Sequence, residues 1–86
     1  MEIKKVLNLL TNQYCKSFKR FQNACSFMPD FNEKVKEFNE DYLKLTSAVL
    51  VGDVEQIYAN LAGNRIYVWA TYNEQNKLRL ELLGAF

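Results

Sequence analysis

The residue patterns that most often carry out catalysis are missing from this sequence. It contains no histidine, and its two cysteines, Cys15 and Cys25, lack the paired spacing of a zinc or redox site. Glu37 and Asp41 share one face of a predicted helix, where a solvated surface is a far commoner arrangement than a catalytic pair. The glycines are isolated, so no phosphate-binding loop is expected. We therefore predict a protein that is not an enzyme and uses neither a metal nor an organic cofactor.

A first candidate binding surface combines aromatic and charged side chains in the C-terminal part of the chain. Its members are expected on one face of a β-hairpin: Arg65, Tyr67, Trp69, Lys77, Arg79, Glu81 and Leu83. Exposed Tyr, Trp and Arg side chains dominate the hot spots of protein interfaces, and aromatic rings beside cations also stack on nucleic-acid bases. The alternative is that Trp69 is covered, either by Arg79 in a cation–π pair or by the third helix and the C-terminal tail.

A second candidate surface is the outer side of the first predicted helix. It carries four cations: Lys5, Lys16, Lys19 and Arg20. Cations along one helical face can contact phosphates. The chain has a net charge of only +1, however, and lacks the basic excess of most nucleic-acid-binding domains. A solvated helix face is the simpler interpretation, with an acidic protein or a nucleic acid as the alternatives.

The elements that must position these residues begin with two long amphipathic helices, predicted over residues 2–28 and 30–51. Pro29 lacks an amide hydrogen and disfavours helical geometry at Met28, while Asp30 can cap the helix that follows, in a capping box with Glu33. Apolar residues recur at helical spacing in both segments: Ile3, Val6, Leu7, Leu10, Tyr14, Phe18, Phe21, Ala24, Cys25 and Met28, then Phe31, Val35, Phe38, Tyr42, Leu45 and Val49. The pattern predicts an antiparallel helical hairpin.

A short third helix is predicted over residues 53–62, after Gly52 ends the second helix in a left-handed conformation. Asp53 and Gln56 match a capping box at its start. Two alternatives remain open, because β-branched residues make residues 46–51 compatible with a strand, and flanking turn signals do the same for residues 54–62.

Residues 65–83 alternate between apolar and polar or aromatic side chains with a period of two. This alternation predicts a β-hairpin with Asn76 in its loop and an aliphatic face turned toward the helices. The predicted fold class is therefore α+β, with an antiparallel helical hairpin, a short third helix and a C-terminal two-stranded antiparallel β-hairpin packed on the helices.

Size and charge add limits on organisation. Residues 1–86 are expected to form one domain, and with 49% apolar residues the chain is too hydrophobic for a disordered tail. Residues 1–29 carry five basic residues and one acidic residue, a net charge of +4, whereas residues 30–53 carry a net charge of −3, so the two helices should attract each other.

The cysteines lie about 15 Å apart along one helix, too far for a disulfide. A cytoplasmic location without membrane insertion is expected, since neither a signal-peptide pattern nor a long apolar run occurs.

These features favour a small non-enzymatic protein-interaction module. Nine Asn, and eight Lys against three Arg, suggest an AT-rich gene. Small chains of this kind are often made by phages or mobile elements to block a host protein. The leading hypothesis is such an inhibitor, of the anti-defence type and consistent with a homodimer. The alternative is a nucleic-acid-binding regulator that uses the basic helix face and the aromatic-cationic face.

Overall fold

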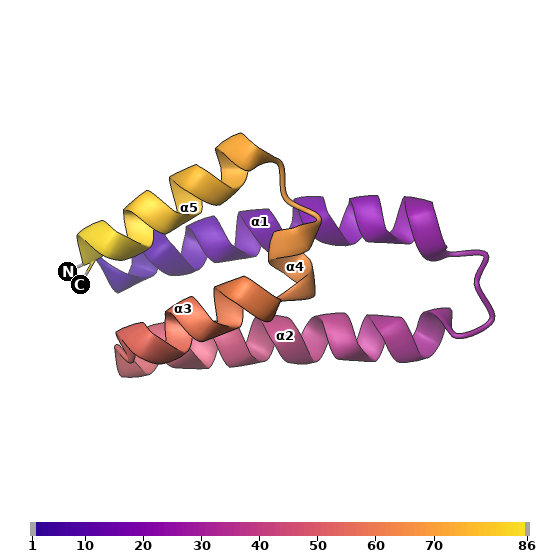
Figure 1. Cartoon of the computed structure of the whole chain (residues 1–86), viewed down its shortest axis with the longest axis horizontal. Helices are drawn as coiled ribbons and strands as arrows, with labels where there is room; N and C mark the ends of the chain where they lie inside the picture. The colour runs from indigo at the N-terminus through magenta and orange to yellow at the C-terminus, as the bar shows by residue number, and fades with distance from the viewer. Residues whose placement is uncertain (1, 86) are drawn as a thin grey trace.

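A computed structural model describes residues 2–85 of the chain, and in this range it contains only helices. They are α1 (Ile3–Cys25), α2 (Phe31–Val51), α3 (Val54–Gly63), α4 (Arg65–Val68) and α5 (Tyr72–Ala85). The predicted α+β class is therefore wrong. In Figure 1, α1 and α2 run antiparallel as two long rods, α3 lies beside α2, and α5 lies beside α1. The short α4 connects the two pairs, within overall dimensions of 42 × 23 × 20 Å.

The turn between the long helices lies where proline predicted it. α1 ends at Cys25, earlier than the expected residue 28, and the amide of Met28 donates to the Cys25 carbonyl at 3.0 Å. The predicted capping box at Asp30 does not form, because its side chain makes no capping hydrogen bond. Its carboxylate lies instead 3.7 Å from the Lys34 amine. The helical hairpin itself is confirmed.

An aromatic cluster fills the half of the hairpin nearest this turn. Phe38 of α2 is fully buried, with its ring stacked on Phe21 at 5.2 Å and edge-on to Phe18 at 5.6 Å between centroids. Trp69 meets Phe21 edge-on at 6.2 Å, so the segment after α4 closes the cluster. These ring contacts join α1, α2 and the α4 region.

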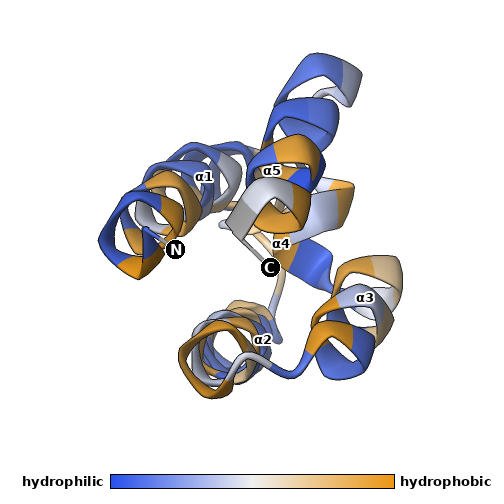
Figure 2. Ribbon diagram, turned by 90° about the vertical axis from the view of Figure 1, so that its left-hand side faces the viewer, coloured by the Kyte–Doolittle hydropathy of each residue, from blue (hydrophilic) through white to orange (hydrophobic). Residues whose placement is uncertain are grey.

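An aliphatic cluster fills the other half of the molecule. Four helices contribute buried side chains to it, and Tyr67 of α4 packs against it half-buried. The buried side chains are those of Val6, Leu10, Leu45, Ala48, Val49, Ile57, Leu61, Leu78 and Leu82. Viewed along the long axis, α1, α2, α3 and α5 surround this common interior (Figure 2). The seam predicted along α2 is confirmed, because its apolar residues are buried or half-buried. In α1 the exception is Ala24, which is exposed near the helix end.

The junction between α2 and α3 follows the local signals of the sequence. Gly52 has φ of 79°, and its amide donates to the Ala48 carbonyl at 3.0 Å. The Asp53 carboxylate accepts a hydrogen bond from the Gln56 amide at 3.1 Å. Both segments for which a strand was the alternative, residues 46–51 and 54–62, are helical.

The predicted β-hairpin over residues 65–83 is the main correction. Ile66 and Ala70 are buried while Val68 between them is exposed, and Leu78 and Leu82 are buried while Leu80 is exposed. The burial period is therefore four rather than two, as a helix requires. Asn76, expected in a loop, lies inside α5. Leu, Lys, Arg, Gln and Glu, which dominate α5, are also strong helix formers.

A capping box at the start of α5 was missed in the sequence. The Glu74 amide donates to the Thr71 hydroxyl at 3.3 Å, and the Thr71 amide donates to the Glu74 carboxylate at 2.8 Å. The pattern Thr-x-x-Glu is the sequence signature of this arrangement.

The opposite charges of α1 and α2 do not pair with each other in the part of the chain that is described. The interhelical ion pairs are instead Lys5–Glu81 and Arg20–Glu74 between α1 and α5, and Arg65 with Glu37 and Asp41 between α4 and α2. The C-terminal third of the chain thus supplies the counter-charges for both long helices.

Candidate functional site

The residues of the first predicted surface do not form one face, because the β-hairpin that would align them is absent. Arg65 is held by Asp41, with Nη1 at 2.9 Å from Oδ2, and lies 3.4 Å from Glu37. The Tyr67 hydroxyl donates to the Gln75 carbonyl at 3.1 Å, and burial raises the pKa of this phenol. Trp69 is half-buried against the aromatic cluster. These three side chains stabilise the fold.

The other members of this surface lie on α5 and point in different directions. Glu81 is half-buried and lies 3.6 Å from the Lys5 amine on α1. Lys77 is exposed. Arg79 and Leu83 lie on the side of α5 that faces α3. Of the predicted set, the structure brings only these two together at a shared concave surface.

The second predicted surface is reduced by ion pairing. Arg20 donates to the Trp69 carbonyl at 2.9 Å and to the Glu74 carboxylate at 2.8 Å. Lys5 lies beside Glu81, as described above. Of the four cations of this surface, Lys16 and Lys19 are thus the two without an ion-pair partner among residues 2–85. The face of α1 is therefore less basic in three dimensions than in the sequence.

Glu74 is the most strongly perturbed acid in the described chain. Hydrogen bonds from the Arg20 guanidinium, followed by the bond from the Thr71 amide, lower the pKa of its carboxyl from 4.5 to about 2. The Glu74 carboxylate holds the start of α5 against α1 through these hydrogen bonds, so its role is structural.

A buried polar junction fastens α4 to α2. The Asp41 carboxylate accepts from the Arg65 amide at 3.0 Å, and the Asp41 carbonyl accepts from the Asn64 side chain at 3.0 Å. The Asn64 side-chain oxygen in turn accepts from the Ile66 amide at 2.9 Å. Every buried polar side-chain atom in this cluster has a hydrogen-bond partner, so none is left unpaired for a ligand.

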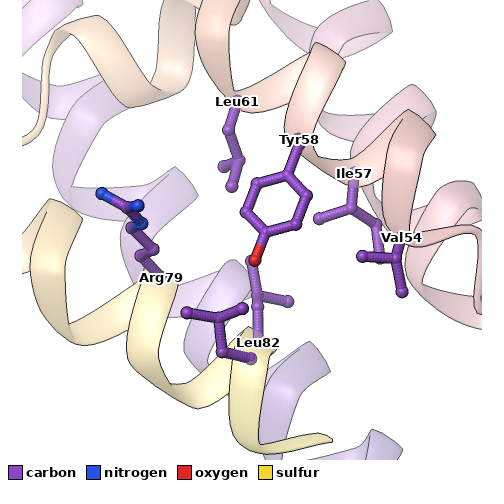
Figure 3. Close-up of a pocket in the computed structure, with 7 residues that line it drawn as sticks. Val54, Ile57, Tyr58, Leu61, Arg79 and Leu82 are labelled. Carbon is purple, nitrogen blue, oxygen red and sulfur yellow. The ribbon is translucent and has the colours of Figure 1, made fainter. Parts of the chain in front are cut away.

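A groove between α3 and α5 is the candidate site. It has a volume of about 160 Å³ and is lined by Val54, Ile57, Tyr58, Leu61, Arg79, Leu82 and Leu83. The base is buried and consists of Ile57, Leu61 and Leu82, whereas the rim residues Val54, Tyr58 and Leu83 are 38–48% exposed. In Figure 3 the Tyr58 ring extends from α3 toward α5, across the groove from the Arg79 side chain.

The groove exists because its two walls belong to different helix pairs. α3 packs on α2, and α5 packs on α1 (Figure 2). The apolar side chains of α3 and α5 that face each other are therefore only partly covered. On α5, Leu78 and Leu82 turn toward the core, whereas Arg79 and Leu83, one position further round the helix, turn toward α3.

Arg79 is the single charged residue in the lining of the groove. The other six lining residues are five aliphatic side chains and one tyrosine. Among residues 2–85, no carboxylate forms an ion pair with Arg79. The site is thus an apolar trough with one cation at its edge.

A more open depression lies on the other side of α3, toward α2. Its lining mixes apolar side chains such as Leu43 and Val51 with polar ones. One of these polar side chains, Asn60, already donates to the Lys44 carbonyl at 3.4 Å. More of its lining residues are polar than in the α3–α5 groove, where Tyr58 and Arg79 are the polar ones.

From the sequence, the residues of the α3 wall were predicted only as the apolar face of a helix. Arg79 and Leu83 were predicted as binding residues, but on the face of a β-hairpin that does not form. The Thr71–Glu74 capping signature would have predicted a helix over residues 72–85. On such a helix Arg79 and Leu83 are one turn apart on one side, distinct from the side of Leu78 and Leu82.

No helix in the described residues is both long enough and apolar enough to cross a membrane. Comparison of the chain with protein-family models, with curated protein sequences and with solved structures gave no match.

Proposed function

We propose that this chain is a protein-interaction module that binds its partner in the groove between α3 and α5. The observation that carries the proposal is the exposed apolar rim formed by Val54, Tyr58 and Leu83 above a buried aliphatic base. Partly exposed apolar side chains that converge from two helices are characteristic of sites that bury the side chains of another protein.

The size of the groove favours a macromolecular partner over a metabolite. Its volume of about 160 Å³ is below the roughly 300–1,000 Å³ of typical small-molecule pockets, and Arg79 and Tyr58 are the polar groups in its lining. A few apolar side chains presented by a partner fit this space.

The expectation of a phage or mobile-element inhibitor is one form of this proposal and stays a prediction. It requires that the host protein be bound through the groove. The nucleic-acid alternative is weakened by the pairing of Lys5 and Arg20 with carboxylates of α5.

Two leucines of α5 allow a matched test. Leu83 lines the groove, whereas Leu80, three residues earlier, is exposed and lies outside the lining. Wild-type chain, Leu83→Glu and Leu80→Glu are immobilised and exposed to lysate of the source organism, with and without nuclease treatment. The captured proteins are identified by mass spectrometry.

The proposal expects a specific protein that is captured by wild type and by Leu80→Glu and lost with Leu83→Glu. Circular dichroism of both variants checks that the helices are retained. Capture that is equal for all three chains would overturn the groove as the docking site. Capture that disappears only with nuclease treatment would favour the nucleic-acid alternative.

A further inference from the structure

We infer that the occupant of the groove is an amphipathic helix of a partner protein, with an acidic residue beside its apolar side chains to pair with Arg79. This inference rests on the proposed function and specifies the chemistry of the partner.

The charge of the partner follows from a comparison of the three arginines. Arg20 is held by Glu74, and Arg65 is held by Asp41, so two of the three guanidinium groups bind carboxylates of their own chain. Arg79 has no such partner among residues 2–85, although it offers five hydrogen-bond donors. A carboxylate on the partner satisfies these donors, whereas a cation beside Arg79 would be repelled.

The helical conformation follows from the walls of the groove. These walls are helix surfaces that present apolar side chains, so they offer no free strand edge with which an extended peptide could form backbone hydrogen bonds. An extended segment would press its amides against apolar side chains, whereas a helix satisfies its own backbone groups.

The dimensions also match a short helix. α3 has ten residues, about 15 Å of helix, which is the length of about three turns. Three apolar side chains at positions i, i+3 or i+4, and i+7 of a partner helix extend over about 10 Å and fit within this length. Leu83, Tyr58 and Val54 then flank the bound helix along the rim.

The test uses a phage-displayed library of helical peptides with randomised exposed positions. The library is selected on the wild-type chain after depletion on the double variant Val54→Glu/Leu83→Glu. The enriched peptides are synthesised with a fluorophore, and their affinities are measured by fluorescence anisotropy against wild type, Arg79→Glu and Lys77→Glu. Lys77 is the matched control, because it is an exposed cation of α5 outside the groove lining.

The expected peptides carry apolar residues at helical spacing and at least one Asp or Glu. Arg79→Glu should weaken their binding about fivefold or more, as for one lost charge pair, while Lys77→Glu changes it less than twofold. A peptide in which the acidic residue is replaced by lysine should bind Arg79→Glu more tightly than it binds wild type.

The other outcomes separate this inference from the proposed function. Groove-dependent peptides without acidic residues, or with affinity unchanged by Arg79→Glu, would overturn the inference and leave the docking groove in place. An absence of groove-dependent peptides would overturn both. A dimer in sedimentation equilibrium that is dissolved by Leu83→Glu and not by Leu80→Glu would identify a second copy as the occupant and overturn the inference.

Discussion

Arg20 of α1 holds Glu74 of α5 in a two-point contact, with Nη1 at 2.8 Å from Oε2 and Nη2 at 3.1 Å from Oε1. The two residues are 54 positions apart in the chain. The contact fixes the first turn of α5 against α1 and thereby sets the position of the wall that carries Arg79 and Leu83. The same guanidinium binds the Trp69 carbonyl, so the connection between α4 and α5 is fastened as well.

The contact predicts a pH dependence of stability below pH 5. The folded chain lowers the pKa of Glu74 from 4.5 to about 2, so the ionised carboxylate favours the folded state. Its stabilising effect is complete above the unfolded pKa and is lost as the pH falls toward 2. Urea unfolding of wild type and Glu74→Gln should differ by about 1–2 kcal/mol at pH 7 and converge near pH 2.

Glutamine suits this comparison because it can also serve in a capping box, so the substitution changes mainly the charge. Curves of unfolding free energy against pH that stay parallel for the two proteins would show that the Arg20–Glu74 contact does not stabilise the fold.

The aromatic cluster predicts a large cost for truncating Phe38. This ring is fully buried among the rings of Tyr14, Phe18 and Phe21, so Phe38→Ala leaves a cavity between α1 and α2. The free energy of unfolding should fall by about 3–5 kcal/mol in urea titrations. Phe27 is the matched control because its side chain is 82% exposed, and Phe27→Ala should change stability by less than about 0.5 kcal/mol. Similar losses for both would contradict the packing.

The two glycines at the ends of α2 and α3 predict opposite effects of the same substitution. Gly52 has φ of 79°, which a Cβ atom disfavours, so Gly52→Ala should destabilise the chain by about 1 kcal/mol. Gly63 is the last residue of α3, and a Cβ atom there would meet no heavy atom within 4 Å. Gly63→Ala should therefore stabilise by up to about 0.5–1 kcal/mol. Thermal unfolding followed by circular dichroism compares the two, and an equal sign for both would refute the assignment.

The buried junction at Asp41 predicts a loss of stability when its charge is removed. The Asp41 side chain is only 12% exposed and accepts from both the amide and the guanidinium of Arg65. Asp41→Asn should lower the free energy of unfolding by about 1–3 kcal/mol, since a charge-assisted bond is lost in a buried site. Glu37, the other carboxylate near Arg65, is 50% exposed, and Glu37→Gln should cost less than about 1 kcal/mol in the same urea titration. A larger loss for Glu37→Gln would reverse this ranking.

The helical hairpin and the junction of α2 with α3 were determined by the sequence itself. Proline at position 29 removes a backbone donor, and apolar residues recur at helical spacing in both long segments. Position 52 has a positive φ, which glycine adopts without strain. These are local effects of covalent structure and of burial along one helix face. They act whatever the rest of the chain does.

The C-terminal third and the candidate site were decided by tertiary structure. In the sequence, the apolar residues of 65–83 fit a period of two as well as a period of four. Which secondary structure forms depends on which leucines are buried, and these are Leu78 and Leu82 in the aliphatic cluster. The groove needs α3 and α5 to face each other. Their placement depends on the shared aliphatic core and on the contacts of Arg20 with Glu74 and of Arg65 with Asp41. Such pairings join residues far apart in the chain, so no local pattern of residues specifies them.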